Sequence, residues 1–146
     1  MKKISLVLLI LCGIHLIAKA QTDPTKSDPT KYVFERDDQV REEQAGPHKG
    51  SGQTVGHSFF DKAPDYHTAF KKRILKSGSS IGYHLQKEDE VYYIIEGNGL
   101  MKINGETFAV KPGDAILTRP GSSHGIAPLE GNDLVIIIVY EKLKKE

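Results

Sequence analysis

The chain has almost none of the residues that cross-link or anchor a small protein. Among its 146 residues there is one cysteine, Cys12, and no tryptophan. A single cysteine cannot form an internal disulfide, so a hydrophobic core must supply the stability. The longest apolar run, near the N-terminus, is too short to span a membrane comfortably, and we predict no membrane span. After residue 20 no segment keeps a helical hydrophobic period, so we expect few helices.

The chain also lacks an excess of either charge. It has 20 basic and 19 acidic side chains and a formal net charge of +1. Without Lys2, Lys3 and Lys19, which lie in a predicted leader, 17 basic and 19 acidic side chains remain. That balance predicts no basic surface for a nucleic acid or an anionic membrane. We therefore expect no nucleic-acid partner.

Residues 1–20 have the pattern of a signal peptide. Two lysines start the segment, an apolar run over 4–17 follows, and an Ala-Lys-Ala sequence ends it. Signal peptidase cuts after such a small-x-small pattern, which predicts a mature chain that begins at Gln21. We therefore expect export to the periplasm or the medium. The alternative, a lipid on Cys12, is disfavoured because Leu11 stands where a small residue is expected.

The rest of the chain is predicted to form a polar arm, one β domain and a charged tail. We place the arm at 21–50, the domain at 51–141 and the tail at 142–146. The only apolar cluster of the arm is 32–34. We interpret the arm as a solvated segment, with an edge strand at 32–34 or a contact with a partner subunit as alternatives.

Short strand-like segments fill the domain, each alternating in hydrophobicity or rich in β-branched and aromatic residues. Turn sequences separate them, and Asn104-Gly105 is the strongest, because both central positions of a type I′ turn need a positive φ. Many short strands with turn signals every eight to twelve residues or so predict an all-β antiparallel sandwich or barrel. The predicted strands are 53–60, 67–75, 81–86, 91–96, 100–103, 106–110, 115–118, 123–126 and 134–140.

Three potential metal ligands, His84, Gln86 and Glu90, lie within one short span of these strands. Alternate residues of a strand point to the same face, so His84 and Gln86 share a face, and Glu90 has the same parity. A buried glutamate beside histidines is costly unless it is paired or bound to a metal. With His124 from later in the chain, these residues predict a four-residue metal pocket.

Two other residues are candidates for binding a substrate. Tyr92 has the parity of Glu90, so it is expected inside the domain, either as core or as a hydrogen-bond donor; Tyr83 and Tyr93 are expected on the outer face. Arg119 lies five residues before His124. It could bind a carboxylate or a sugar phosphate, although an exposed turn arginine is the favoured interpretation.

The remaining basic and histidine side chains are interpreted as structural. The basic run 71–73 is expected to form a solvated strand face, with a role in binding a substrate anion as the alternative. We interpret His57 and His67 as hydrogen-bonded core or surface residues and His48 as a loop residue without a partner. The glycine-rich segment 46–56 lacks the spacing of a phosphate-binding loop.

Two stretches of the chain resemble the two motifs of the cupin superfamily. The second stretch reads GDAILTRPGSSH and ends at His124, and the first reads GSSIGYHLQKEDEVYYIIEG over 78–97. The resemblance covers about 52–141. It implies a jelly-roll β-barrel, commonly a homodimer, with a metal inside the barrel. The implied metal-binding residues are His84, Gln86, Glu90 and His124.

The sequence departs from the cupin pattern at two positions. Gln86 replaces a histidine, so a neutral amide oxygen stands in place of an imidazole nitrogen, and Arg119 replaces a proline. Gln86 would either bind the metal directly or hydrogen-bond a bound water. The donor set suits a borderline divalent transition metal, and iron, manganese, nickel and zinc all remain open.

Two classes of function follow from this resemblance. The favoured one is an exported, metal-dependent enzyme acting on a small organic molecule by oxygenase, isomerase, decarboxylase or lyase type chemistry. The alternative is a non-enzymatic cupin that binds a sugar or an organic acid. Fold resemblance alone does not decide between them.

Overall fold

A computed structural model describes residues 23–26 and 28–142 of the chain. The predicted signal peptide and most of the charged tail therefore lie outside the described residues. Within these residues there are three short 3-10 helices, η1 (Pro24–Lys26), η2 (Asp37–Gln39) and η3 (Pro47–Lys49). The strands are β1 (Arg41–Ala45), β2 (Gln53–Phe59), β3 (Thr68–Leu75), β4 (Ile81–Leu85), β5 (Glu90–Glu96), β6 (Gly99–Ile103), β7 (Glu106–Val110), β8 (Ala115–Thr118), β9 (Ser123–Pro128) and β10 (Leu134–Glu141).

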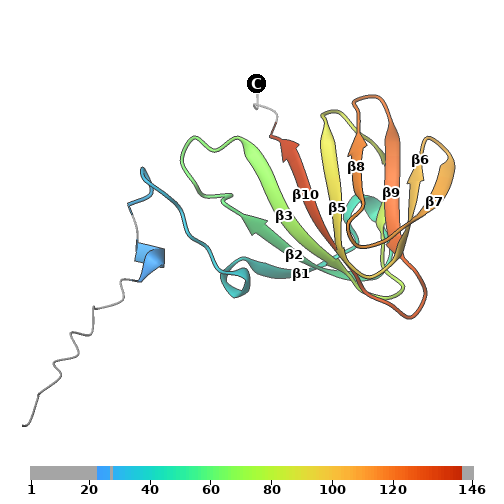
Figure 1. Ribbon diagram of the computed structural model, residues 1–146, viewed down its shortest axis with the longest axis horizontal. Coiled ribbons are helices and arrows are strands. Elements are labelled where there is room, and N and C mark those ends of the chain that lie inside the picture. The colour runs from blue at the N-terminus through green and yellow to red at the C-terminus, as the bar shows by residue number, and fades with distance from the viewer. Residues whose placement is uncertain (1–22, 27, 143–146) are drawn as a thin grey trace, which may run out of the picture.

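The strands form two antiparallel sheets that pack face to face (Figure 1). One sheet has six strands in the order β1-β2-β3-β10-β5-β8, and the other has four in the order β4-β9-β6-β7. This arrangement confirms the predicted all-β jelly-roll fold. No helix among the described residues has the length and apolar character that crossing a membrane requires.

The hydrophobic core fills the space between the sheets. β10 lies in the middle of its sheet, between β3 and β5, as its continuous apolar sequence predicts. Inward-facing side chains alternate along the strands, while Tyr83 and Tyr93 are exposed on the outer faces as expected. The core cluster consists of Leu75, Ile81, Tyr92, Ile94, Met101, Val110, Ile126, Leu134, Ile136 and Ile138.

The Asn104-Gly105 turn joins β6 to β7 as predicted. Asn104 has φ 49° and Gly105 has φ 91°, the two positive values that a type I′ turn needs. The Asn104 side chain also accepts a hydrogen bond from the Ser123 N–H at 2.9 Å, and the Asn104 N–H donates to the Ser123 carbonyl at 2.9 Å. The hairpin thereby holds the start of β9, the strand that carries His124.

The chain joins the sheet earlier than the sequence indicates. Residues 32–34 are not a strand; instead β1 pairs with β2 in register from Arg41–His57 to Ala45–Gln53. β1 is polar and mostly exposed, which removes the hydrophobic alternation that identifies a strand in a sequence. β1 and η3 both lie within the range 21–50 that was assigned to the polar arm.

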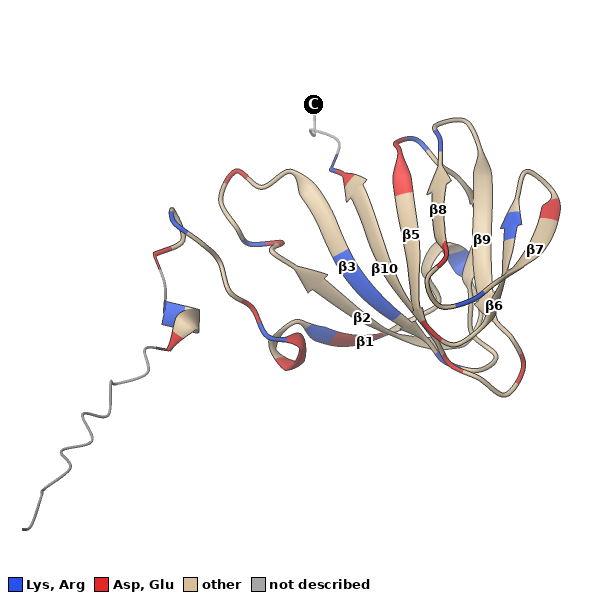
Figure 2. Ribbon diagram, in the orientation of Figure 1, with Lys and Arg blue, Asp and Glu red and all other residues tan. Residues whose placement is uncertain are grey.

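The interpretation of the basic run 71–73 of β3 as a solvated strand face is wrong for Arg73. Arg73 lies opposite Ile136 of β10 and points between the sheets, where only 7% of it is exposed. Lys71 shares this inward face, whereas Lys72 points outward (Figure 2 shows the basic segment in the middle of β3). Arg73 stays inside because its Nη1 donates to Thr54 Oγ1 at 3.0 Å and to Gln44 Oε1 at 3.1 Å.

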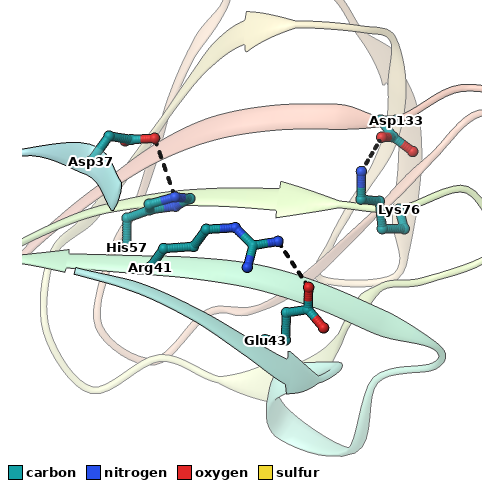
Figure 3. Close-up of polar contacts among 6 residues, drawn as sticks. All are labelled: Asp37, Arg41, Glu43, His57, Lys76 and Asp133. Atoms are coloured by element: carbon teal, nitrogen blue, oxygen red, sulfur yellow. Dashed lines mark hydrogen bonds and ion pairs between the residues drawn. The ribbon is translucent and has the colours of Figure 1, made fainter. Parts of the chain in front are cut away.

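The outer face of β2 and β3 is covered by the arm. Asp37 of η2 lies over His57, with 3.3 Å between Asp37 Oδ2 and His57 Nε2 (Figure 3). Asp37 also pairs with Lys72. His57 is 1% exposed although it points away from the space between the sheets. Burial, followed by the charge of Lys72, holds the pKa of His57 below its usual 6.5, while Asp37 opposes that shift.

Acidification should therefore destabilise the protein through His57. Its folded-state pKa lies below the unfolded value of 6.5, so this contribution to stability is present above pH 6.5 and is lost as the pH falls. We expect urea unfolding to show a smaller loss of stability between pH 7.5 and about pH 5 in His57→Gln than in the wild type. Equal losses in the two proteins would show that His57 is not the responsible group.

Candidate metal centre

The four predicted metal-site residues converge between the two sheets. His84 of β4 and His124 of β9 are cross-strand partners in the four-stranded sheet, and their ring centroids are 4.7 Å apart. Glu90 begins β5 in the opposite sheet. One ligand atom from each of these three residues lies within 4.8 Å of the other two. The site thus forms only where the two sheets face each other.

Both histidines have one ring nitrogen occupied by a neighbour. His84 Nδ1 lies 2.8 Å from the Gly82 carbonyl oxygen, which can only accept, so Nδ1 carries the proton. His124 Nδ1 lies 2.8 Å from Thr118 Oγ1, and both of these side chains are buried. Hydrogen bonds at Nδ1 set the tautomer of such a ring and leave Nε2 for a metal, the usual arrangement of metal-binding histidines.

Two ligand atoms in the site have no hydrogen-bond partner among the described residues. Glu90 Oε2 and His124 Nε2 are both buried, and they lie 2.9 Å apart. This close contact brings two ligand atoms together without a hydrogen bond between them. Buried polar atoms without a partner are costly, and a divalent cation between them would satisfy both. The donor set therefore fits a metal ion.

Gln86 lies at the edge of the same cavity. It follows the last residue of β4 and is 6% exposed. Its backbone is held by the β8–β9 loop, because Gln86 N–H donates to the Ser122 carbonyl at 2.8 Å and Gly121 N–H donates to the Gln86 carbonyl at 3.0 Å. The side-chain amide is thereby presented to the cavity from a fixed backbone, which suits either a direct ligand or a partner for a bound water.

Three of the four metal-site residues, His84, Gln86 and Glu90, line a small cavity of about 160 Å³. Pockets that take drug-sized ligands measure about 300–1,000 Å³, so this one suits a compact ligand. Two cationic side chains, Lys71 and Arg73, line it from β3, and Glu88 lines it from the β4–β5 loop. Within the described part of the chain the buried Arg73 Nε–H has no hydrogen-bond partner, so it is a candidate donor to an anion.

Tyr92 and Arg119, the two predicted substrate-binding residues, differ in position. Tyr92 lines the cavity, 5.0 Å from the His124 ring by centroids. Burial, together with the charge of Glu90 and a hydrogen bond to it, raises the pKa of the Tyr92 phenol well above 10.0, so the phenol stays protonated. Arg119 lies outside the cavity, with a 69% exposed side chain that pairs with Asp89 at 3.2 Å. The structure thus brings Tyr92, and not Arg119, to the site.

Sequence reasoning missed the contact that His48 makes. His48 was expected to have no partner, but its ring stacks on the His84 ring with centroids 3.5 Å apart and planes at 2°. Core and surface environments were both expected for His57 and His67. His57 is buried and His67 is exposed. No motif marks His48; only the folding of η3 onto β4 brings it to the site.

These features define a class of protein: a small antiparallel jelly roll with a histidine- and glutamate-lined cavity. The family model described as "Cupin domain" matches residues 72–140. A crystal structure of a cupin superfamily protein from Desulfitobacterium hafniense aligns with a TM-score of 0.54 and 13% identity, covering 68% of this chain and 84% of that one. At that identity the likeness shows the fold alone. Residues 72–140 therefore match a cupin domain, and the fold of the described chain is the cupin fold.

A curated relative and a solved structure, both from Thermotoga maritima, have names that mention oxalate. An oxalate-binding protein is 38% identical over 71 residues, which cover 48% of this chain and 59% of that protein. The match therefore spans less than two thirds of this relative's own length. A crystal structure of a predicted oxalate decarboxylase shares 28% identity with a TM-score of 0.68, covering 76% of this chain and all of that chain.

The Thr118 hydroxyl should support metal binding without contacting the metal. Thr118→Val keeps the side-chain shape but removes the partner of His124 Nδ1. Loss of such a partner typically lowers metal affinity about 10–100-fold, and we expect this range for Zn²⁺ measured by calorimetry. Thr107→Val, the same change at an exposed position of β7, is the control and should bind as the wild type does. Equal affinities of the two variants would contradict the role of Thr118.

Proposed function

We propose that this protein is a metal-dependent cupin that acts on a small organic acid of the oxalate class. The observation that carries the proposal is the pair of unpartnered buried atoms, Glu90 Oε2 and His124 Nε2, beside a small cavity with cationic walls. His84, Glu90 and His124 would hold a divalent transition metal, with Gln86 as a direct ligand or through a water. Such an ion supplies Lewis acidity and a template for an anionic ligand.

Arg73 makes the cavity suitable for a carboxylate. Its guanidinium is fixed by Thr54 and Gln44 and still has the free Nε–H. Burial lowers the pKa of Arg73 below its usual value, but arginine stays charged in proteins. A dicarboxylate would place one carboxylate at the metal and the other at this guanidinium. The names of the curated relative and of the solved structure from Thermotoga maritima support oxalate as the first ligand to test.

We propose decarboxylation as the reaction. Decarboxylation of oxalate breaks its carbon–carbon bond, releases carbon dioxide and leaves formate once the remaining carbon takes a proton. The chain has a group for that proton in the half-buried Glu88 carboxyl at the cavity wall. The Tyr92 phenol, whose one proton is hydrogen-bonded to Glu90, would orient that carboxylate beside the bound anion.

A non-enzymatic binder of the same organic acid is the second candidate function. Gln86 favours it, since a neutral amide donates less electron density to a metal than the histidine expected at this position. Both functions require metal and Arg73; they differ in turnover. Carbon dioxide release that Glu88→Gln abolishes, and Asp89→Asn leaves unchanged, would support the enzyme. Oxalate binding with no carbon dioxide from the metal-loaded protein would support the binder.

Oxalate should stabilise the metal-loaded protein in a way that depends on Arg73. At about 100 times its Kd a ligand adds about 2.7 kcal/mol, which raises the Tm of a chain of this size by about 5–10 °C. Arg73→Met should lose that rise, whereas Lys72→Met removes an equal charge from the outer face of the same strand and should keep it. An oxalate-induced rise that survives complete removal of metal by a chelator would contradict a metal-centred site.

Export and dimerisation are proposed on separate grounds. The signal-peptide pattern of residues 1–20 supports export, and the mass of the protein recovered outside the cytoplasm should then correspond to a chain starting at Gln21.

Exposed apolar side chains on the outer side of the four-stranded sheet, Tyr83, Leu85 and Leu100, support a homodimer. Light scattering during gel filtration should give twice the chain mass; a monomer at all concentrations would contradict the dimer.

A further inference from the structure

The segment 46–50 forms one wall of the cavity although it precedes the stretch that matches the cupin model. It follows β1 and contains η3, which packs on β4, and Pro47 and His48 line the cavity. Hydrogen bonds close the segment at both ends: Gly46 N–H donates to the Gly52 carbonyl at 3.0 Å, and Gly50 N–H donates to the Pro47 carbonyl at 2.9 Å. Backbone hydrogen bonds therefore give this wall of the cavity a defined conformation.

This wall lies closer to β4 than side chains would permit. A Cβ on Gly50 would lie 2.0 Å from the Ser80 carbonyl oxygen, and a Cβ on Gly82 would lie 2.2 Å from the His48 carbonyl oxygen. Only glycine permits these two approaches. His48 has a φ of 54°, which is uncommon for a residue other than glycine and persists only where the surroundings determine it. The backbone at His48 is thus held in place.

The His48 ring covers one face of the His84 ring. Their centroids are 3.5 Å apart and their planes differ by 2°, so the rings overlap as flat plates. His84 is only half-buried, and its one hydrogen bond, from Nδ1 to Gly82, fixes an edge of the ring but not its tilt. Histidine adopts a broad range of χ2 angles, so a second contact is needed to fix the tilt of the His84 ring. His48 supplies that contact.

We propose that His48 is a positioning residue for the metal centre: it stacks on His84 and fixes the ring plane so that Nε2 is aimed at the metal. This inference rests on the proposed metal site. It makes the segment 46–50, which carries no cupin motif, part of the functional unit. His48 acts through its aromatic face, so a flat ring without nitrogen should replace it.

Two substitutions at His48 separate this role from others. His48→Asn removes the ring and keeps a residue that tolerates a positive φ, and His48→Phe keeps a flat ring. Calorimetry with Co²⁺ should show a loss of affinity on the order of tenfold for His48→Asn and an affinity close to that of the wild type for His48→Phe. His67→Asn, the same change at an exposed histidine, is the control and should bind as the wild type does.

The absorption spectrum of bound Co²⁺ provides a readout that a general loss of stability would not move. At saturating Co²⁺ we expect an altered d–d spectrum for His48→Asn and the wild-type spectrum for His48→Phe. Thermal unfolding without metal checks that both variants are folded. Wild-type affinity and spectrum in His48→Asn, or equal losses in both variants, would overturn the inference. If the wild type itself binds no Co²⁺, the proposed function fails instead.

Discussion

The structure depends on the burial of one carboxylate, that of Glu90, against two imidazoles from the opposite sheet. Taking a carboxylate out of water costs several kcal/mol unless other groups compensate it. Glu90 is 6% exposed and His124 is fully buried, and their facing atoms have no other partner. The pair exists only because β5 belongs to one sheet and β9 to the other. The hydrophobic core between the sheets therefore also holds the ligand set together.

Neighbouring residues hold the side chains of the site in place by hydrogen bonds. Thr118 and Gly82 orient the two imidazoles, and Gln44 and Thr54 orient the Arg73 guanidinium. These supports come from strands and loops spread over both sheets, including β1, which lies before the matched cupin stretch. A site whose side chains are fixed by such neighbours is preorganised, so little ordering free energy is lost when a metal or an anion binds.

The sequence was sufficient for the fold and for the centre of the site, but not for its periphery. Strand parity and motif spacing bring His84, Gln86, Glu90 and His124 together, because these are local properties of short strands. The sequence does not show which of the three consecutive basic residues 71–73 points inward. Only the pairing of β3 with β10 places Arg73 on the inner face. His48 depends on a loop contact with β4 that no local pattern encodes. Arg119 matches a motif position, yet its turn directs it to Asp89 at the surface.

The most direct test of this account is the metal content of the protein purified without added chelator and then offered divalent transition metals. Elemental analysis should give one transition-metal ion per chain for the wild type. His124→Ala, which removes the most buried ligand, should have little or none while it still unfolds cooperatively. A wild-type protein that takes up no metal, or a variant that holds as much as the wild type, would contradict the metal centre on which the account rests.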